Sequence, residues 1–215
     1  MKKPFFLALV TVFYFVCSPA WGEKARQLSW EDLIPADLQS SDPLAELTYE
    51  QRETVYWLSY VGDTLNAGQE TDEELIEEVK TAIKELDESG IDVNLILEKL
   101  TEIGTAIVHE LDGQSVRIPG YLLPLEMSGS KATEFLLVPY VGACIHVPPP
   151  PRNQIVYVKT APGKGYASEE LFDPVWVKGV MTAQPLVKDL YLVDGTADIN
   201  IGYSMQATQV EPYKE

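Results

Sequence analysis

The hydrophobic pattern of this chain changes near residue 107, and that change constrains the fold more than any other feature. Before it, from about residue 28, apolar residues recur at the three- and four-residue spacing of amphipathic helices. After it come short runs rich in β-branched and aromatic residues, separated by Gly and Pro, as is typical of strands. The pattern predicts an α+β protein with a helical acidic region at 23–107 and a β domain at 108–215.

The first 22 residues have the pattern of a cleaved export signal. Lys2 and Lys3 precede an apolar run over 5–16, which is too short to span a bilayer comfortably. Ala20 and Gly22 supply the small residues needed three places and one place before the cut. We therefore expect cleavage after Gly22, a periplasmic location and no stable membrane insertion of the mature chain.

Three helices are expected in the first region, over 49–65, from about 71 to the residue before Gly90, and over 93–103. Their expected capping residues are Thr48 with Gln51, Thr71 with Glu74, and Asp92. A short turn or helix over 29–35 is expected to dock Trp30. The outer face of the second helix is acidic, and we interpret it as a solvated face, with a surface for cations or a basic partner as the alternative. The whole chain has 33 acidic and 16 basic residues, which argues against a nucleic-acid partner.

In the second region, Asp112-Gly113 predicts a tight hairpin between runs at 107–111 and 115–118. Further strands are expected over 120–125, 134–140, 154–159, 175–182 and 197–206. Gly120 and Gly179 lie inside strand-like runs, where glycine commonly marks a bulge or a bend. About five short strands with such bends fit a small OB-like antiparallel β-barrel, with the acidic N-terminal helical segment packed on it.

The segment 141–151 is the most unusual in the chain. Once Cys17 is removed with the signal, Cys144 is the sole thiol, so no internal disulfide can form. In an extended segment Cys144 and His146 project to the same side, about 7 Å apart at Cα. A thiolate with an imidazole suits zinc, with copper as the alternative. A stiff polyproline stretch is expected to position this pair, and it consists of Pro148, Pro149, Pro150 and Pro151.

A zinc site needs more than two ligands. The other histidine, His109, is the expected third ligand, and the possible additional ligands are Glu110, Asp112 and Glu126. Two other interpretations stay open for Cys144: a small buried side chain, or the reactive thiol of a thiol-dependent enzyme or redox partner. The tyrosines and tryptophan of the β region leave open a metal-free OB-like module that binds protein or glycan.

The run DGQSVRIPGYLLPLE at 112–126, followed by FLLVPY at 135–140 and the segment 142–154, resembles the DUF3299 family of Gram-negative envelope proteins. The resemblance implies similarity to proteins encoded beside ABC transport components, some of them in zinc-responsive operons, and it implies no catalytic residues. Residues and resemblance together predict a periplasmic, non-enzymatic accessory or binding protein of an ABC-type transport system. We expect it to be linked to zinc or another soft metal, with a permease or another envelope protein as partner.

Overall fold

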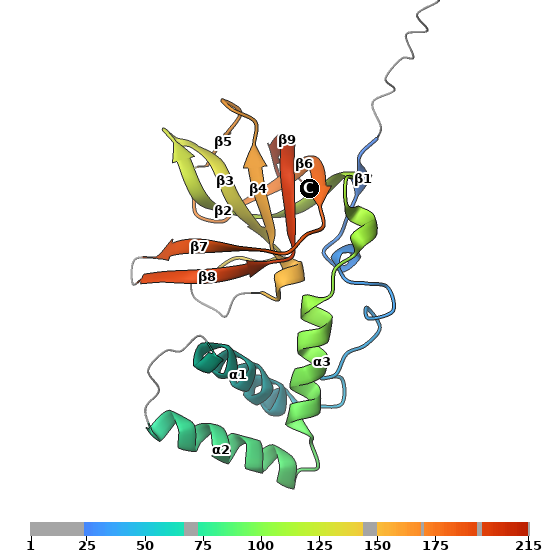
Figure 1. Cartoon of the computed structure of the whole chain (residues 1–215), viewed down its shortest axis with the longest axis vertical. Helices are drawn as coiled ribbons and strands as arrows, with labels where there is room; N and C mark the ends of the chain where they lie inside the picture. Colours follow the sequence, from blue (N-terminus) through green and yellow to red (C-terminus); the bar gives the residue numbers. More distant parts are fainter. Residues whose placement is uncertain (1–23, 67–72, 144–149, 169, 193–194, 215) are drawn as a thin grey trace, which may run out of the picture.

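The computed structural model describes residues 24–66, 73–143, 150–168, 170–192 and 195–214. Figure 1 shows a β-barrel connected by one helix to two further helices that lie beyond the end of the barrel. Within the described ranges, no helix is long and apolar enough to cross a membrane. The architecture confirms the expected α+β class.

Three α-helices follow one another along the chain, α1 (Tyr49–Asn66), α2 (Glu73–Glu88) and α3 (Val93–Thr105). The capping box of α1 is confirmed, because the Thr48 amide donates to Gln51 Oε1 at 2.9 Å and the Gln51 amide donates to Thr48 Oγ1 at 3.3 Å. Asp92 caps α3 by accepting the Leu95 amide at 3.1 Å. Thr71 lies outside the described residues. The helices share a small core of Leu44, Val55, Leu58, Leu86 and Val93.

Five strands close the barrel, and they are β2 (Ser115–Ser128), β3 (Lys131–Val138), β4 (Val156–Thr160), β6 (Asp173–Thr182) and β9 (Tyr203–Pro212). Around the barrel the order is β2-β3-β4-β9-β6, and β6 returns to β2. The long first strand pairs with both the second and the fourth, which is the topology of an OB barrel. The expected antiparallel arrangement holds except at one pair: β4 and β9 are parallel, since a long crossover rather than a hairpin connects them.

The prediction of a hairpin at Asp112-Gly113 is wrong. Residues His109–Leu111 form a 3-10 turn, η2, whose Leu111 is fully buried in the barrel core instead of pairing in a strand. Gly113, at φ 72°, donates its amide to the Met181 carbonyl, so the Asp-Gly turn docks on the end of β6. A segment that covers the end of a barrel contains the same kinds of apolar residue as a strand. The spacing of these residues alone does not distinguish the two structures.

The expected strand over 197–206 is two strands. β8 (Gly195–Ile201) forms a hairpin with β7 (Leu186–Leu192), and β9 starts after Gly202. A Cβ at Gly202 would lie 2.8 Å from the Arg152 carbonyl oxygen, so only glycine fits where the chain turns between the two strands. The expected bulge at Gly179 is confirmed, because the register of β6 against β9 shifts between Lys178 and Gly179.

The second half of strand β3, residues 135–138, is buried on both of its faces. Phe135 and Leu137 point into the barrel core, whereas Leu136 and Val138 pack outside it with Ile199 and its neighbours in β8. The β7–β8 hairpin therefore covers part of the outer wall of the barrel. Burial on both sides explains why residues 135–138 are a continuous apolar run rather than an alternating one.

The residues before the helices join the barrel. β1 (Arg26–Gln27) pairs in parallel with β2, and the 3-10 turn η1 (Glu31–Leu33) buries Leu33 in the barrel core. Trp30 docks as expected, against Gly120, where a Cβ would approach the indole ring to 2.9 Å. From residue 26 the chain thus lies on the barrel, leaves it to form the helices and then returns to it.

Candidate functional site

The expected ligand segment leaves the barrel at one buried residue and returns at another. Cys144 and His146, with Pro148 and Pro149, lie outside the described residues. Ala143, just before them, is fully buried in the apolar cluster on the outer wall of the barrel. Pro150, just after them, is also buried. Both ends of the segment are therefore packed into the protein.

The C-terminal end of this segment is fastened to helix α3. Arg152, in the 3-10 turn η3 (Arg152–Gln154), donates from Nε and Nη2 to the Thr105 carbonyl at 3.0 and 2.7 Å. Asn153 Nδ2 donates to the Ile103 and Ala106 carbonyls at 2.7 and 3.0 Å. The last carbonyls of a helix lack partners within it, and a cation is favourable there. These hydrogen bonds from Arg152 and Asn153 connect the end of helix α3 to the barrel, and we call this set of contacts the joint.

Two further features define the joint. A Cβ at Gly104 would lie 2.7 Å from Pro151 Cβ, so the helix and the proline are in close contact only because residue 104 is glycine. Asn153 is 1% exposed, and within the described part of the protein its Oδ1 atom has no hydrogen-bond partner. The amide is held by its two donated bonds alone.

The structure places His109, Glu110 and Asp112 together on and directly after η2. All three are exposed, but Asp112 Oδ1 already accepts the Ala183 amide at 3.0 Å. Among the described residues no group of three His, Cys, Asp or Glu side chains is placed to hold a metal ion. A three-ligand site that includes His109 would therefore need a ligand from outside the described residues, and Cys144 and His146 are the expected ones.

Glu126 is not brought to His109. It lies near the end of β2, whereas η2 precedes the start of that strand. Across a register shift it is paired with Glu134 of β3, and its charge acts on Tyr157 of β4. Glu126 thus belongs to a different part of the barrel from the other candidate ligands.

A charged cluster on β3, β4 and β7 was missed by the sequence reasoning. The Tyr157 hydroxyl donates to Glu134 Oε2, and Lys159 Nζ lies 2.6 Å from Glu134 Oε1. Lys188 Nζ of β7 lies 4.4 Å from the centroid of the Tyr157 ring. The cluster depends on Glu134 and Lys159 being directly opposite each other, a register that no short motif reveals.

The pKa values of this cluster move away from neutrality. Hydrogen bonds from Lys159 and Tyr157 lower the pKa of Glu134, and burial together with Glu134 raises the pKa of Tyr157. At neutral pH neither group is placed to exchange a proton. The arrangement attaches the β7–β8 hairpin to the barrel wall.

A family model described as a protein of unknown function, DUF3299, matches residues 30–212. The chain belongs to the DUF3299 family. It is similar to a DUF3299 family protein of Pseudomonas aeruginosa PAO1 whose crystal structure is known: the two are 34% identical over 89% of this chain and 98% of that one, with a TM-score of 0.48. No curated protein matches the chain. The DUF3299 match includes the three helices as well as the barrel, beyond the segment that carried the resemblance.

Proposed function

We propose that this DUF3299 protein is a periplasmic, non-enzymatic accessory or binding protein of an ABC-type transport system that holds zinc, or another soft metal, through Cys144 and His146. The transport partner rests on the family resemblance. The metal rests on the chemistry of the two side chains, because thiolate and imidazole are the ligands that zinc and copper prefer.

One observation carries the metal proposal: the joint of Asn153 with helix α3 fixes two chain segments side by side. The Asn153 side chain bonds the Ala106 carbonyl at 3.0 Å. His109 follows Ala106 by three residues, and Pro150 precedes Asn153 by three, so each lies within roughly 10 Å of chain from the joint. The exposed imidazole of His109 therefore lies close along the chain to the joint at which the Cys-x-His segment ends, and we propose it as the third ligand.

Fixed ends also favour binding. The two residues that flank the ligand pair, Ala143 and Pro150, are both buried. In general, a ligand pair between two fixed ends costs less entropy to hold around a metal than a pair on a free tail. This is the role that we propose for the four prolines, Pro148 to Pro151.

The contacts of the charged cluster favour the proposal that the barrel has no catalytic role. Glu134 and Tyr157 bond each other, and their pKa values lie further from neutrality than those of the free side chains. General acid–base catalysis is most effective when the pKa lies near the working pH. These two groups are better suited to stabilising the wall than to moving protons.

The test measures bound metal in mature protein that has been purified without chelator. We expect about one zinc per chain by elemental analysis, its loss in Cys144→Ser and His146→Ala, and weakened binding in His109→Ala. Glu126→Gln is the matched control, because it removes a candidate ligand at the other end of β2, and it should retain the metal.

Two results would contradict the proposal. The first is protein that neither copurifies with metal nor binds added zinc, and whose Cys144 thiol reacts only after unfolding, which would identify a buried structural cysteine. The second is a metal-free protein in which one equivalent of alkylating agent reacts rapidly with Cys144, which would favour the thiol-dependent enzyme.

A further inference from the structure

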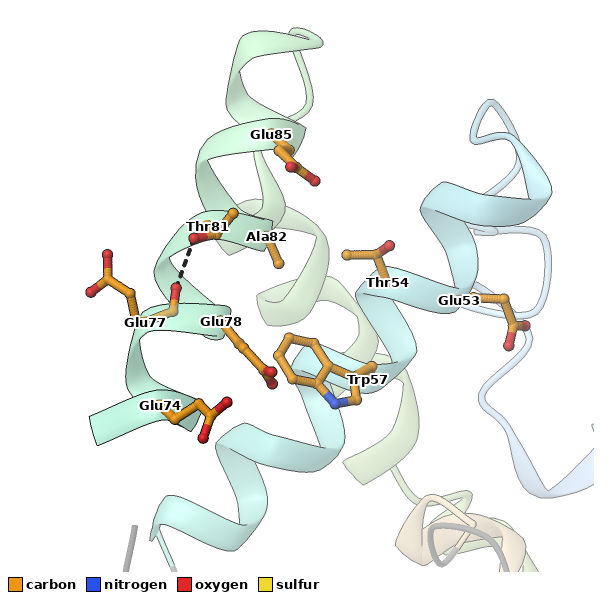
Figure 2. Close-up of a pocket in the computed structure, with 9 residues that line it drawn as sticks. All are labelled: Glu53, Thr54, Trp57, Glu74, Glu77, Glu78, Thr81, Ala82 and Glu85. Carbon is orange, nitrogen blue, oxygen red and sulfur yellow. Dashed lines mark hydrogen bonds between the residues drawn. The ribbon is translucent and has the colours of Figure 1, made fainter. Parts of the chain in front are cut away.

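Helices α1 and α2 border a shallow, open groove of about 670 Å³, shown in Figure 2. Three lining residues come from α1 and six from α2, and they are Glu53, Thr54, Trp57, Glu74, Glu77, Glu78, Thr81, Ala82 and Glu85. None of these described lining residues is basic. The groove belongs to the helical part of the molecule, and none of the proposed metal ligands is among the residues that line it.

Charge is segregated around α2. Its glutamates Glu74, Glu78 and Glu85 point into the space between the helices (Figure 2). Its two lysines lie outside the groove, where Lys80 pairs with Glu77 at 3.3 Å and Lys84 pairs with Glu88 at 3.7 Å. Of the lining glutamates of α2, Glu77 pairs with Lys80, whereas Glu74, Glu78 and Glu85 form no ion pair with either lysine of the helix.

Helix stability explains only part of this arrangement. Glu74 is in the first turn of α2, where a negative charge is favourable. Glu78 and Glu85 lie beyond that turn, and Glu78 is four residues from Glu74, a spacing at which like charges repel by about 0.2–0.5 kcal/mol. A lysine at position 78 would turn this repulsion into an attraction.

An aromatic ring lies between the carboxylates. Trp57 extends from α1 toward α2, and the Glu78 carboxylate points toward its ring (Figure 2). The face of a tryptophan ring is the side-chain surface that attracts cations most strongly. A cationic side chain placed in this groove would meet an indole and carboxylates together.

Exposed tyrosines continue this surface along α1. Tyr49, Tyr56 and Tyr60 are 79, 54 and 47% exposed, although large aromatic side chains usually bury most of their area. Their spacing of seven and four residues places them on one face of the helix, together with Glu53 at the edge of the groove. Tyrosine and tryptophan are the residues most enriched in protein interfaces.

We propose that the α1–α2 groove and this tyrosine face form the docking site for a basic amphipathic helix of a partner protein. Its arginine or lysine side chains lie over Trp57 and pair with Glu74, Glu78 and Glu85, and its apolar side chains contact the tyrosines. Charge complementarity selects a basic occupant and disfavours anionic ones such as nucleic acid. Residues 74 to 85 extend over roughly 16 Å, which is the length of about three turns of a bound helix.

The test uses the mature full-length protein and a fluorescein-labelled 16-residue amphipathic peptide that carries arginines on one face and leucines on the other. The groove variant is Glu74→Gln/Glu78→Gln/Glu85→Gln. The control variant, Glu46→Gln/Glu98→Gln/Glu102→Gln, removes the same charge from exposed positions that do not line the groove. Fluorescence anisotropy gives the dissociation constants, and circular dichroism confirms that both variants stay helical.

We expect the groove variant to bind the peptide at least tenfold more weakly, and the control variant to change the affinity less than twofold. A peptide with citrulline in place of arginine should not bind, and binding should weaken with added salt. Tyr56→Ser should weaken binding several-fold with every glutamate present.

Equal losses in the two triple variants would overturn the proposal in favour of a general attraction to an acidic protein. Undiminished binding by Tyr56→Ser would overturn the part played by the tyrosine face. The same titration on Cys144→Ser should give the wild-type affinity, so failure of the metal proposal and failure of this one are distinguishable.

Discussion

The barrel and the three-helix part of this protein bury their side chains to different extents. In the barrel, Phe135, Leu137 and Val177 are fully inaccessible, and the strands are paired all the way round. In the helical part Val55 is fully buried, but Trp57 and most of the other apolar side chains remain partly exposed. The barrel closes on itself, whereas the helices present much of their surface.

From this difference in burial we infer that the barrel and the helical part have different roles. A region with few fully buried contacts and many solvent-exposed backbone hydrogen bonds opens at a lower free energy than a closed barrel. The helices are held by their caps, a small core and the Arg152–Asn153 joint. We expect the barrel to provide the stable support and the helices to provide the surface for recognition.

The largest effect is expected inside the barrel. Phe135→Ala removes a fully buried ring and should lower the free energy of unfolding by about 3–5 kcal/mol, measured by urea denaturation. Leu171→Ala, at a 63% exposed position, is the control and should stay within about 0.5 kcal/mol of wild type. A cost below 1 kcal/mol for Phe135→Ala would remove the basis for treating the barrel as the stable part.

The next prediction tests whether the helices open separately. Leu58→Ala should cost about 2–5 kcal/mol locally and raise hydrogen exchange in α1 and α2 while the β-strand amides stay protected. The exposed Leu95→Ala on α3 is the control. Equal loss of protection in helices and strands would mean that the two parts unfold as one unit.

The joint should show an intermediate effect. Asn153→Ala leaves the Ile103 and Ala106 carbonyls without their donor, and we expect a loss of about 1–3 kcal/mol together with faster exchange at the end of α3. Asn94→Ala changes an exposed asparagine of the same helix and should have little effect. Unchanged hydrogen-exchange protection of α3 in Asn153→Ala would mean that the remaining contacts of the joint are enough to keep the end of this helix in place.

The smallest effect is electrostatic and depends on pH. The pKa of Glu134 is lowered by Lys159 and Tyr157, so its ionised form stabilises the folded protein above the ordinary value of 4.5, and this stabilisation is lost as the pH falls through the lowered pKa. Glu134→Gln should therefore cost up to about 1 kcal/mol at pH 7 and less as the pH falls below 4.5. Urea denaturation at several pH values measures the difference from wild type, with Glu126→Gln as the control. A cost that does not change with pH would indicate packing rather than charge.

Local signals in the sequence predicted most of the elements. The three helices, the Thr48 and Asp92 caps, the Gly179 bulge and an OB-like barrel follow from residue spacing and are confirmed. These features depend on residues a few positions apart, where the physical rules are strongest.

What could not be predicted depends on contacts between distant segments. The strand-like run before Asp112 forms the turn η2, which buries Leu111 in the barrel core, instead of a strand. The parallel pair of β4 and β9 is connected by a long crossover, for which no turn motif exists in the sequence. The joint connects Asn153 to Ile103, fifty residues away. The groove needed two helices to come together, because the α2 sequence shows its glutamates but not the Trp57 ring opposite them.

Of the expected ligands, His109, Glu110 and Asp112 lie on or directly after η2 and Glu126 lies near the end of β2, and among the described residues no three such side chains are placed to hold a metal ion. The expectation for Cys144 and His146 lies outside the described residues and stays a prediction.

The order of the strands around the barrel has a consequence for folding. Among the described strands, β9 follows the others in sequence, yet it lies between β4 and β6, which no other described strand bridges. The barrel wall therefore closes only when β9 has inserted between these two edges. We expect this closure to be a slow step, because the β4–β9 pairing joins segments that are far apart in the sequence.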